Sequence, residues 1–357
     1  MDFRPIFLLP LLSLILVSCG DDKVEPQEPD PAPQADPAPQ EDTPVEAPAE
    51  AAKPEPAAVP AQPQFWSDVK LHEAIREKNP GYTGNGQFQI DESGQVQAIA
   101  LDNCGATDLS PLSGMNLMAL YLQSCPVADI TPIKGMPLVE LYLENTAVKD
   151  LSPLEGMADL RKLYISGTAV SDLSPLKGLS ISELNLVNTQ VTDLSPLAGM
   201  PIQMLWLTDS PVRDIAPLAE VPMVSLTLHR TPVTDISPLA NTGLQRLHIG
   251  ETDVTDISPL KGMQLTRLVF DAEKIENGME VLQQMPSLRE LGTKFEDGAN
   301  NLKPPPVFWQ EWMLKNAAVP TAEIPAPEPE PAPAPAPAPA PAQTPAPAPV
   351  DGTSSGS

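Results

Sequence analysis

The chain has 357 residues, a formal net charge of −26 and 46 prolines, most of them near its two ends. A strongly acidic protein repels phosphate, so we do not expect nucleic acid as a partner. The stretches 19–64 and 317–357 are rich in Pro and Ala and bury too little apolar surface to offset the entropy of ordering. We therefore expect two disordered arms around one folded unit over 65–316.

Residues 1–18 have the pattern of an export signal. Arg4 supplies a positive charge, and the apolar run Ile6–Val17 is too short to span a bilayer comfortably. The run ends in Leu16-Val17-Ser18-Cys19, which resembles the bacterial lipobox. The resemblance implies a lipoprotein signal peptide, acylation of Cys19 with palmitate-type chains, and lasting attachment to a membrane of a bacterial cell envelope, inner or outer. The alternative is an ordinary secretory signal with an incidental cysteine.

If Cys19 carries lipid, residues 19–64 form an acidic, Pro/Ala-rich tether, with eleven acidic residues between Asp21 and Pro60. The folded unit then begins with a predicted cap over 65–95. Ser67–Lys78 has the apolar spacing of a helix, and Gln87–Ile90 alternates as a strand does. Such a cap is needed where a repeated array would otherwise expose its core.

Residues 96–270 repeat a unit of 21 residues, with one extra residue in the unit that contains Ala158-Asp159. Each unit opens with an apolar-x-apolar tripeptide, and Asp-[Leu/Ile]-[Ser/Thr/Ala]-Pro-[Leu/Ile] follows in eight of the nine. Alternate residues of a short parallel strand face inward, so the outer pair fills the core and the middle residue faces solvent. An inward hydroxyl or thiol three residues later is expected to bond backbone groups at the turn. Ser then caps a helical turn with Pro at its first position.

The full unit, apolar-x-x-Leu-x-Leu-x-x-Thr-x-Val-x-Asp-Leu-Ser-Pro-Leu, resembles the internalin-like class of leucine-rich repeats. The resemblance implies parallel strands on a concave face and 3-10 turns on the convex face. Thr, Ser or Cys replaces the ladder Asn that is common in the wider superfamily. We therefore predict a leucine-rich-repeat solenoid with α/β caps. Cys104 and Cys125 hold equivalent positions on adjacent turns, either as buried thiols or as a disulfide.

A second cap is predicted over 271–316. Within it, Glu273–Met285 has helical spacing, and Leu288–Leu291 is expected to add an irregular last strand. The aromatic segment Phe308–Trp312 is expected to fold back over the end of the solenoid. The remaining residues, 317–357, are the disordered Pro/Ala tail.

The middle position of each strand is where the sequence stops repeating. Three consecutive units place Tyr121, Tyr142 and Tyr164 there, and Trp206 and His248 follow further along. An amphipathic aromatic stripe on a concave sheet is typical of protein or glycan recognition. The alternative is cross-strand stacking that only stabilises the sheet.

Charged side chains flank this stripe. Glu140, Glu144 and Glu183 lie beside the tyrosines. Arg246 and Arg267 are equivalent on adjacent strands, about 5 Å apart, which favours a carboxylate or phosphate of a ligand between them unless the two side chains splay into solvent. The predicted ligand-binding residues are Tyr121, Tyr142, Tyr164, Trp206, Arg246, His248 and Arg267.

The sequence contains no catalytic constellation and no cofactor motif. His229 and His248 lie diagonally on neighbouring strands near Asp271, but no convincing third metal ligand exists, and the Asp column is better explained by turn bonding than by calcium. We expect no enzyme, no cofactor and no metal. The expected function is a monomeric, lipid-anchored envelope scaffold that binds a protein or glycan on its concave face. The alternative is a structural spacer or cell-wall-associated protein without a ligand there.

Overall fold

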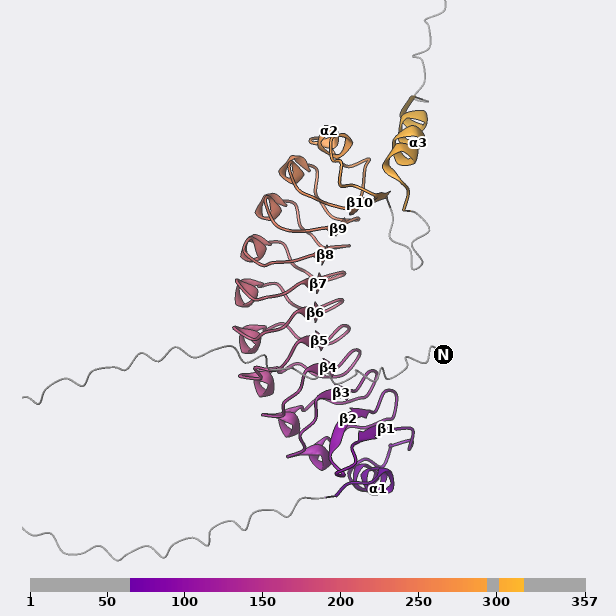
Figure 1. Ribbon diagram of the computed structural model, residues 1–357, viewed down its shortest axis with the longest axis vertical. Helices are drawn as coiled ribbons and strands as arrows, with labels where there is room; N and C mark the ends of the chain where they lie inside the picture. The colour runs from indigo at the N-terminus through magenta and orange to yellow at the C-terminus, as the bar shows by residue number, and fades with distance from the viewer. Residues whose placement is uncertain (1–64, 294–301, 318–357) are drawn as a thin grey trace, which may run out of the picture. The chain divides into compact units, whose positions relative to one another are not determined.

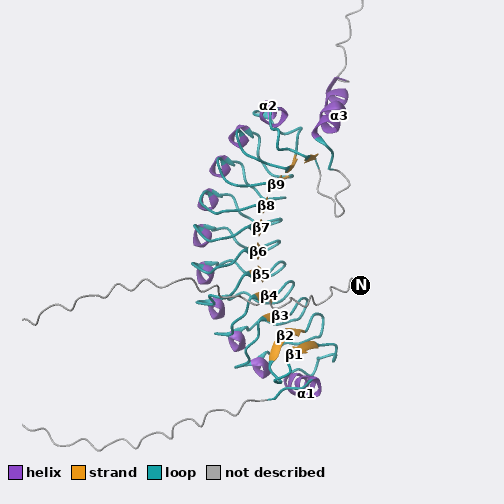
Figure 2. Ribbon diagram, in the orientation of Figure 1, coloured by secondary structure: helices purple, strands orange, loops and turns teal. Residues whose placement is uncertain are grey.

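The computed structural model describes residues 65–293 and 302–317. The predicted signal peptide, Cys19, the tether and the tail beyond residue 317 lie outside the described residues. Within the described ranges, eleven strands form one sheet in chain order, with β1 antiparallel to β2 and the other neighbours parallel. The strands line one side of an arc, and 3-10 turns line the other (Figures 1 and 2). The predicted leucine-rich-repeat solenoid is confirmed.

The strands are β1 (Gln87–Ile90), β2 (Val96–Ala100), β3 (Ala119–Tyr121), β4 (Glu140–Tyr142), β5 (Lys162–Tyr164), β6 (Glu183–Asn185), β7 (Met204–Trp206), β8 (Ser225–Thr227), β9 (Arg246–Ile249), β10 (Arg267–Phe270) and β11 (Glu290–Gly292). The 3-10 turns are η1 (Ser110–Leu112), η2 (Thr131–Ile133), η3 (Ser152–Leu154), η4 (Ser174–Leu176), η5 (Ser195–Leu197), η6 (Ala216–Leu218), η7 (Ser237–Leu239) and η8 (Ser258–Leu260). The helices are α1 (Asp68–Lys78), α2 (Met279–Gln283) and α3 (Pro305–Ala317).

The core runs unbroken along the solenoid because every turn contributes the same inward residues. In β4 and just after it, Leu141 and Leu143 are fully buried. The hydroxyl of Thr146 donates to the Leu143 carbonyl at 2.7 Å, as expected. The equivalent bond recurs at Thr168, Thr189, Ser210, Thr231 and Thr252.

The 3-10 turns differ from the prediction at their first residues. Serine is the first residue of the turn instead of its cap, and proline is the second. The group that caps the turn is the aspartate two residues earlier: Asp172 Oδ1 accepts from the Ser174 backbone N–H at 2.8 Å. The same bond recurs in all eight turns. It satisfies the first N–H that the turn leaves unpaired, and this bonding holds the pKa of Asp172 below its usual range.

The N-terminal end is covered by α1, which begins one residue after the predicted start, with Ser67 as its cap. Asn79, which is buried, ends the helix and joins it to the first repeat. Its side-chain amide donates to the carbonyls of Ile75 and Asp108, and its Oδ1 accepts from the Thr107 and Asp108 N–H groups. The cap is therefore hydrogen-bonded to the repeats as well as packed on them.

The predicted helix over Glu273–Met285 is wrong in its first half, since α2 spans only Met279–Gln283. The preceding residues continue the solenoid: the Glu276 N–H donates to the Thr255 carbonyl of the turn before it at 2.8 Å. Backbone groups that pair with the previous turn cannot also form helical bonds. Gly278, at φ +91°, then turns the chain into the short helix.

The far end of the solenoid is closed as predicted by the aromatic segment, which lies in α3. Phe308 is buried and its ring centroid lies 5.9 Å from that of Phe270. A backbone bridge between Leu291 and Lys303 joins the segment before α3 to β11. None of the helices in the described ranges is long and apolar enough to cross a membrane.

The two cysteines of the repeats are buried free thiols. Cys125 Sγ donates to the Leu101 carbonyl of the preceding turn at 2.8 Å. Of the two alternatives that the sequence left open, the structure therefore has thiols packed as small core residues.

Candidate binding site on the concave face

The three tyrosines of the concave face form a stack across adjacent strands. The ring centroids of Tyr121 and Tyr142 are 4.8 Å apart, and those of Tyr142 and Tyr164 are 4.6 Å apart with 15° between the planes. Trp206 ends the stack with a tilted contact to Tyr164 at 5.9 Å. This spacing follows from the register of β3, β4 and β5, which places the tyrosines opposite one another.

The tyrosine hydroxyls are bonded to acidic residues of the next strand. Tyr121 donates to Glu140 Oε2 at 2.9 Å and Tyr164 to Glu183 Oε2 at 2.7 Å. Lys162, which lies between the two glutamates on β5, has its Nζ 3.2 Å from Glu140 and 3.8 Å from Glu183. Burial, together with the neighbouring carboxylates, raises the pKa of Tyr121 and Tyr164 above their usual range. The stack is therefore an internally bonded part of the sheet.

The expectation that every middle residue faces solvent is wrong at three positions. Tyr142 is 9% exposed, His248 5% and Val269 3%. Tyr142 is covered on both ring faces by its stacked neighbours, and His248 is covered on one by the ring of His229 at 4.9 Å. A side chain that points outward from a strand can still be buried, because neighbouring strands lie only about 4.8 Å apart and large side chains on them stack on one another.

A groove of about 550 Å³ opens on the concave face over β7 to β10. It contains four of the seven predicted site residues and none of the tyrosines. Its lining side chains include Met204, Trp206, Thr208, Asp209, Ser225, Thr227, His229, Arg230, Arg246, His248, Arg267 and Val269. The predicted site is thus divided between a tyrosine stack and a separate hollow.

The outward side chains that line the groove are shortest on β8. In the middle column, Thr227 stands between Trp206 and His248, and in the column two residues earlier Ser225 stands between Met204 and Arg246. Two short side chains between longer ones on both neighbouring strands leave a hollow. We refer to the space above Ser225 and Thr227 as the β8 hollow.

Arg246 and Arg267, which the sequence predicts to be equivalent on adjacent strands, lie opposite each other on β9 and β10. Glu290, opposite Arg267 on β11, accepts a hydrogen bond from Arg267 Nε at 2.5 Å. The acidic partner of Arg267 is therefore part of the chain. Arg246 is exposed, and within the described ranges no carboxylate lies within ion-pair distance of it.

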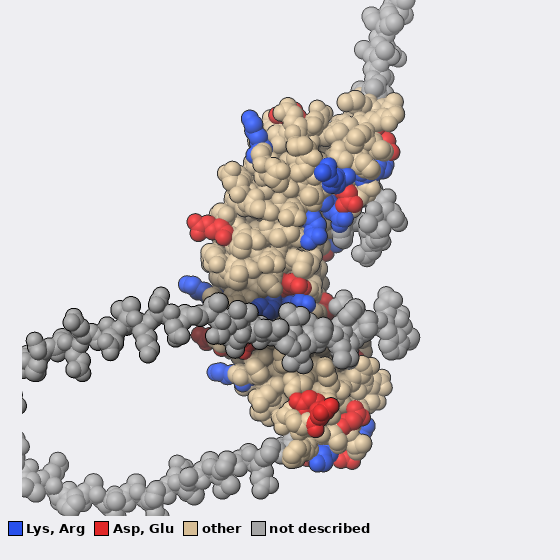
Figure 3. All heavy atoms as spheres, viewed as in Figure 1, with Lys and Arg blue, Asp and Glu red and all other residues tan. Residues whose placement is uncertain are grey.

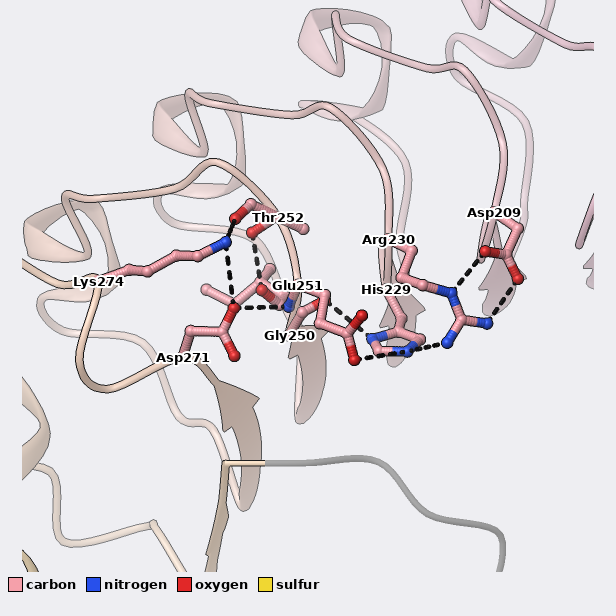
Figure 4. A network of polar contacts seen from close by, with 9 residues as sticks. Asp209, His229, Arg230, Gly250, Glu251, Thr252, Asp271 and Lys274 are labelled. Atoms are coloured by element: carbon pink, nitrogen blue, oxygen red, sulfur yellow. Dashed lines mark hydrogen bonds and ion pairs between the residues drawn. The ribbon is translucent and has the colours of Figure 1, made fainter.

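A polar network borders the groove along the residues that follow the strands (Figure 4). Arg230 binds Asp209 with two bonds, Nε to Oδ1 at 2.6 Å and Nη2 to Oδ2 at 2.7 Å, while its Nη1 lies 2.8 Å from His229 Nε2. His229 Nδ1 lies 2.9 Å from the Gly250 carbonyl oxygen. A guanidinium only donates and a carbonyl only accepts, so His229 is neutral with its proton on Nδ1. This network fixes the guanidinium of Arg230.

His248 lies beneath this network and is neutral as well. Its ring is parallel to that of His229 within 15°. Burial, with His229 and Arg230 nearby, lowers the pKa of His248 to about 3. The positive charge of the groove therefore comes from its three arginines, against one lining carboxylate, Asp209. Figure 3 shows several Lys and Arg side chains near β9 and β10, with Asp and Glu beside them.

The sequence groups Arg230 with Arg246 and Arg267 near the C-terminal turns, but the predicted site residues do not include it, and the β8 hollow was not predicted, although a column of the repeat marks Arg230. At one position of the repeat, just after each strand, the backbone φ is positive, and the first six turns place Asn103, Ser124, Asn145, Gly167, Asn188 and Asp209 there. Arg230, at φ 52°, is the first long side chain in this column, and Glu251, at φ 55°, follows it. A long side chain in the left-handed region is uncommon and often marks a functional position.

No three His, Cys, Asp or Glu side chains gather as metal ligands anywhere in the described part of the chain. His229 and His248 stack on each other, and Asp271 instead accepts from the Glu251 N–H at 2.8 Å. The arrangement of the concave face supports recognition through aromatic and charged side chains.

No protein-family model matches the chain, and no curated protein matches its sequence. Among solved structures, it is similar to an internalin (InlF) from Listeria monocytogenes, with 27% identity, a TM-score of 0.51, and coverage of 64% of this chain and 69% of that one. Internalin C2 of the same organism gives 28% identity, a TM-score of 0.48, and coverage of 56% and 92%. The chain is thus a leucine-rich-repeat solenoid with an internalin-like fold, an architecture that serves protein interaction in general.

Proposed function

We propose that this chain is an exported, lipid-anchored scaffold of a bacterial cell envelope that binds a protein partner in the groove over β7 to β10. One observation carries the site: here the concave face departs from its repeat, with a hollow, an aromatic wall and three arginines together. Aromatic and arginine side chains around a recess are the residues that dominate binding energy in protein interfaces.

The tyrosine stack supports the groove and extends the aromatic surface up to Trp206. Its hydroxyls already donate to Glu140 and Glu183, so polar recognition there would have to break internal bonds. Trp206 both contacts Tyr164 and lines the groove. We therefore place the energetically dominant contacts at the groove and assign the stack a mainly structural role.

Photo-cross-linking in cells tests this function. A photoreactive phenylalanine analogue replaces Met204, which lines the groove, and in a matched control it replaces Ala198, which is exposed beside η5. We expect one defined protein adduct from position 204 and none from position 198. Equal labelling from both positions, or no protein adduct from 204, would contradict the proposal and favour a spacer without a ligand on this face.

A further inference from the structure

We propose that the partner presents an acidic segment with one large apolar side chain, which enters the β8 hollow while a neighbouring carboxylate binds Arg246. This inference rests on the proposed function, and it adds the chemistry of the ligand.

The β8 hollow has the walls that an apolar side chain requires. Trp206 borders it from β7, and the stacked rings of His229 and His248 border it on the other side, while Thr227 contributes no ring. The stack at β3 to β5 shows the same column filled: there each strand contributes a ring and neighbouring centroids lie 4.6 to 4.8 Å apart. A single ring or branched aliphatic group from a partner would restore at β8 the packing that the chain itself provides at β4.

The neutral state of both histidines fits an apolar occupant. His229 is held as a neutral tautomer by Arg230 and the Gly250 carbonyl, and its ring stacks on His248. The wall beside the hollow is therefore a pair of uncharged rings. Burying an apolar side chain against the faces of these rings costs no desolvation of a charge on the rings themselves.

The charge of the segment follows from the state of the three arginines. Arg230 is bonded to Asp209 through two nitrogens, and Arg267 is bonded to Glu290 through Nε. Arg246 stands opposite Arg267 with no such carboxylate among the described residues. Glu290 already offsets the charge of Arg267, so an incoming carboxylate would form a charge-assisted pair with Arg246.

The distance between these features sets the order of groups in the ligand. Arg246 and His248 alternate on the same strand, and Ser225 and Thr227 lie opposite them on β8. The carboxylate site and the hollow are thus within two residues of each other along a strand, about 7 Å. An acidic residue next to a large apolar residue, or two positions from it, satisfies both.

A randomised linear peptide library selected on the immobilised full-length chain tests the inference. We expect the selected peptides to place Asp or Glu within two positions of Phe, Tyr, Trp, Leu or Ile. Arg246→Gln should weaken a selected peptide at least about tenfold, since a charge-assisted bidentate pair is lost. Arg213→Gln removes the same charge from an exposed position outside the groove and should leave affinity within about twofold.

A second pair of variants tests the hollow. Thr227→Tyr adds a ring between Trp206 and His248 and should abolish binding while the protein keeps or gains stability, because the added ring extends a stack. Ala100→Tyr adds the same ring to the same column at β2, outside the groove, and should bind as the parent does. Thr227→Val keeps the hollow open and should also bind. If a urea titration shows that Thr227→Tyr is not folded, Arg246→Gln still tests the inference, because the Arg246 side chain is exposed and its replacement should leave the fold intact.

Several outcomes would overturn the inference. Selected peptides that are basic or lack apolar residues would do so, as would peptides that bind Arg246→Gln or Thr227→Tyr with parental affinity. Inorganic polyphosphate that binds the parent and Thr227→Tyr equally would identify a general anion site instead. If these results occur while position 204 still cross-links one protein, the proposed function stands and only the ligand chemistry is wrong. If position 204 gives no adduct, the function fails as well.

Discussion

The hydroxyl of Tyr164 donates a hydrogen bond of 2.7 Å to Glu183 on the neighbouring strand. The same relationship joins Tyr121 to Glu140, and Lys162 lies between the two carboxylates. The concave face is therefore bonded along the sheet as well as through its backbone. Because these tyrosine hydroxyls are already bonded within the sheet, a ligand could use them only by breaking those bonds.

The bond between Tyr164 and Glu183 should contribute measurably to stability. Tyr164→Phe is expected to lower the free energy of unfolding by about 2 kcal/mol, because the hydrogen bond to a charged acceptor is lost. A double-mutant cycle with Glu183→Gln in urea titrations measures the coupling between the two side chains. Strict additivity of the two single variants would show that the bond contributes nothing.

The same tyrosines predict a loss of stability in alkali. Their pKa values are raised in the folded state, mainly by burial, so above the usual tyrosine pKa the folded chain keeps protons that the unfolded chain releases. Stability should therefore fall as pH rises above about 10. The Tyr121→Phe/Tyr164→Phe variant should show a shallower fall, measured as urea midpoints over this pH range. An unchanged slope would mean that these hydroxyls do not titrate differently on folding.

Tyr142, stacked between two rings and nearly buried, should be the most important member of the stack for stability. Tyr142→Ala is expected to cost about 3 kcal/mol of unfolding free energy through the lost stacking and the cavity left behind, and Tyr142→Phe much less. Urea denaturation measures both. If the alanine variant instead keeps its stability and loses its partner, Tyr142 is a ligand contact, as the sequence alone predicts.

His248 should make the solenoid sensitive to mild acid. Its pKa falls from an unfolded value near 6.5 to about 3, so between these values the unfolded chain binds a proton that the folded chain does not. Stability should be fully present above pH 6.5 and fall as pH is lowered, by on the order of 2 kcal/mol over the first two pH units.

His248→Phe keeps a ring in the stack but cannot titrate, so it should remove most of this acid dependence. Thr227→Val changes a residue of the groove that cannot titrate and should retain the parental slope. Urea midpoints measured between about pH 4.5 and 6.5 test this, because a histidine of the unfolded chain becomes protonated over this range while the aspartates that cap the turns stay ionised. Parallel curves for parent and His248→Phe would contradict the buried, neutral state of His248.

The lipid anchor at Cys19 stays a prediction, since the residue lies outside the described ranges. Cys19→Ala should prevent acylation, so metabolic labelling with an alkyne fatty acid should be lost and the protein should leave the membrane fraction. Ser18→Ala keeps a small residue before the cysteine and should still be labelled. Labelling that persists in Cys19→Ala would place the modification elsewhere or exclude it.

The sequence by itself determined the solenoid, the position of each strand in its unit and the side on which each column lies. It did so because a strict 21-residue period makes every turn bury the same residues, and because alternation along a strand is a local property. It also placed Arg246 opposite Arg267 and the glutamates beside the tyrosines, because residues one repeat length apart occupy equivalent positions on adjacent strands.

Only the tertiary structure decided the contacts that break this regularity. Glu290 of the irregular last strand pairs with Arg267, and residues 273–277 extend the solenoid where the spacing alone indicates a helix. The β8 hollow likewise depends on which side chains meet across three strands. Some of these features depend on the size and conformation of side chains in neighbouring turns, and others lie at chain ends where the repeat is lost. The repeat itself specifies neither the packing between turns nor the structure of the ends.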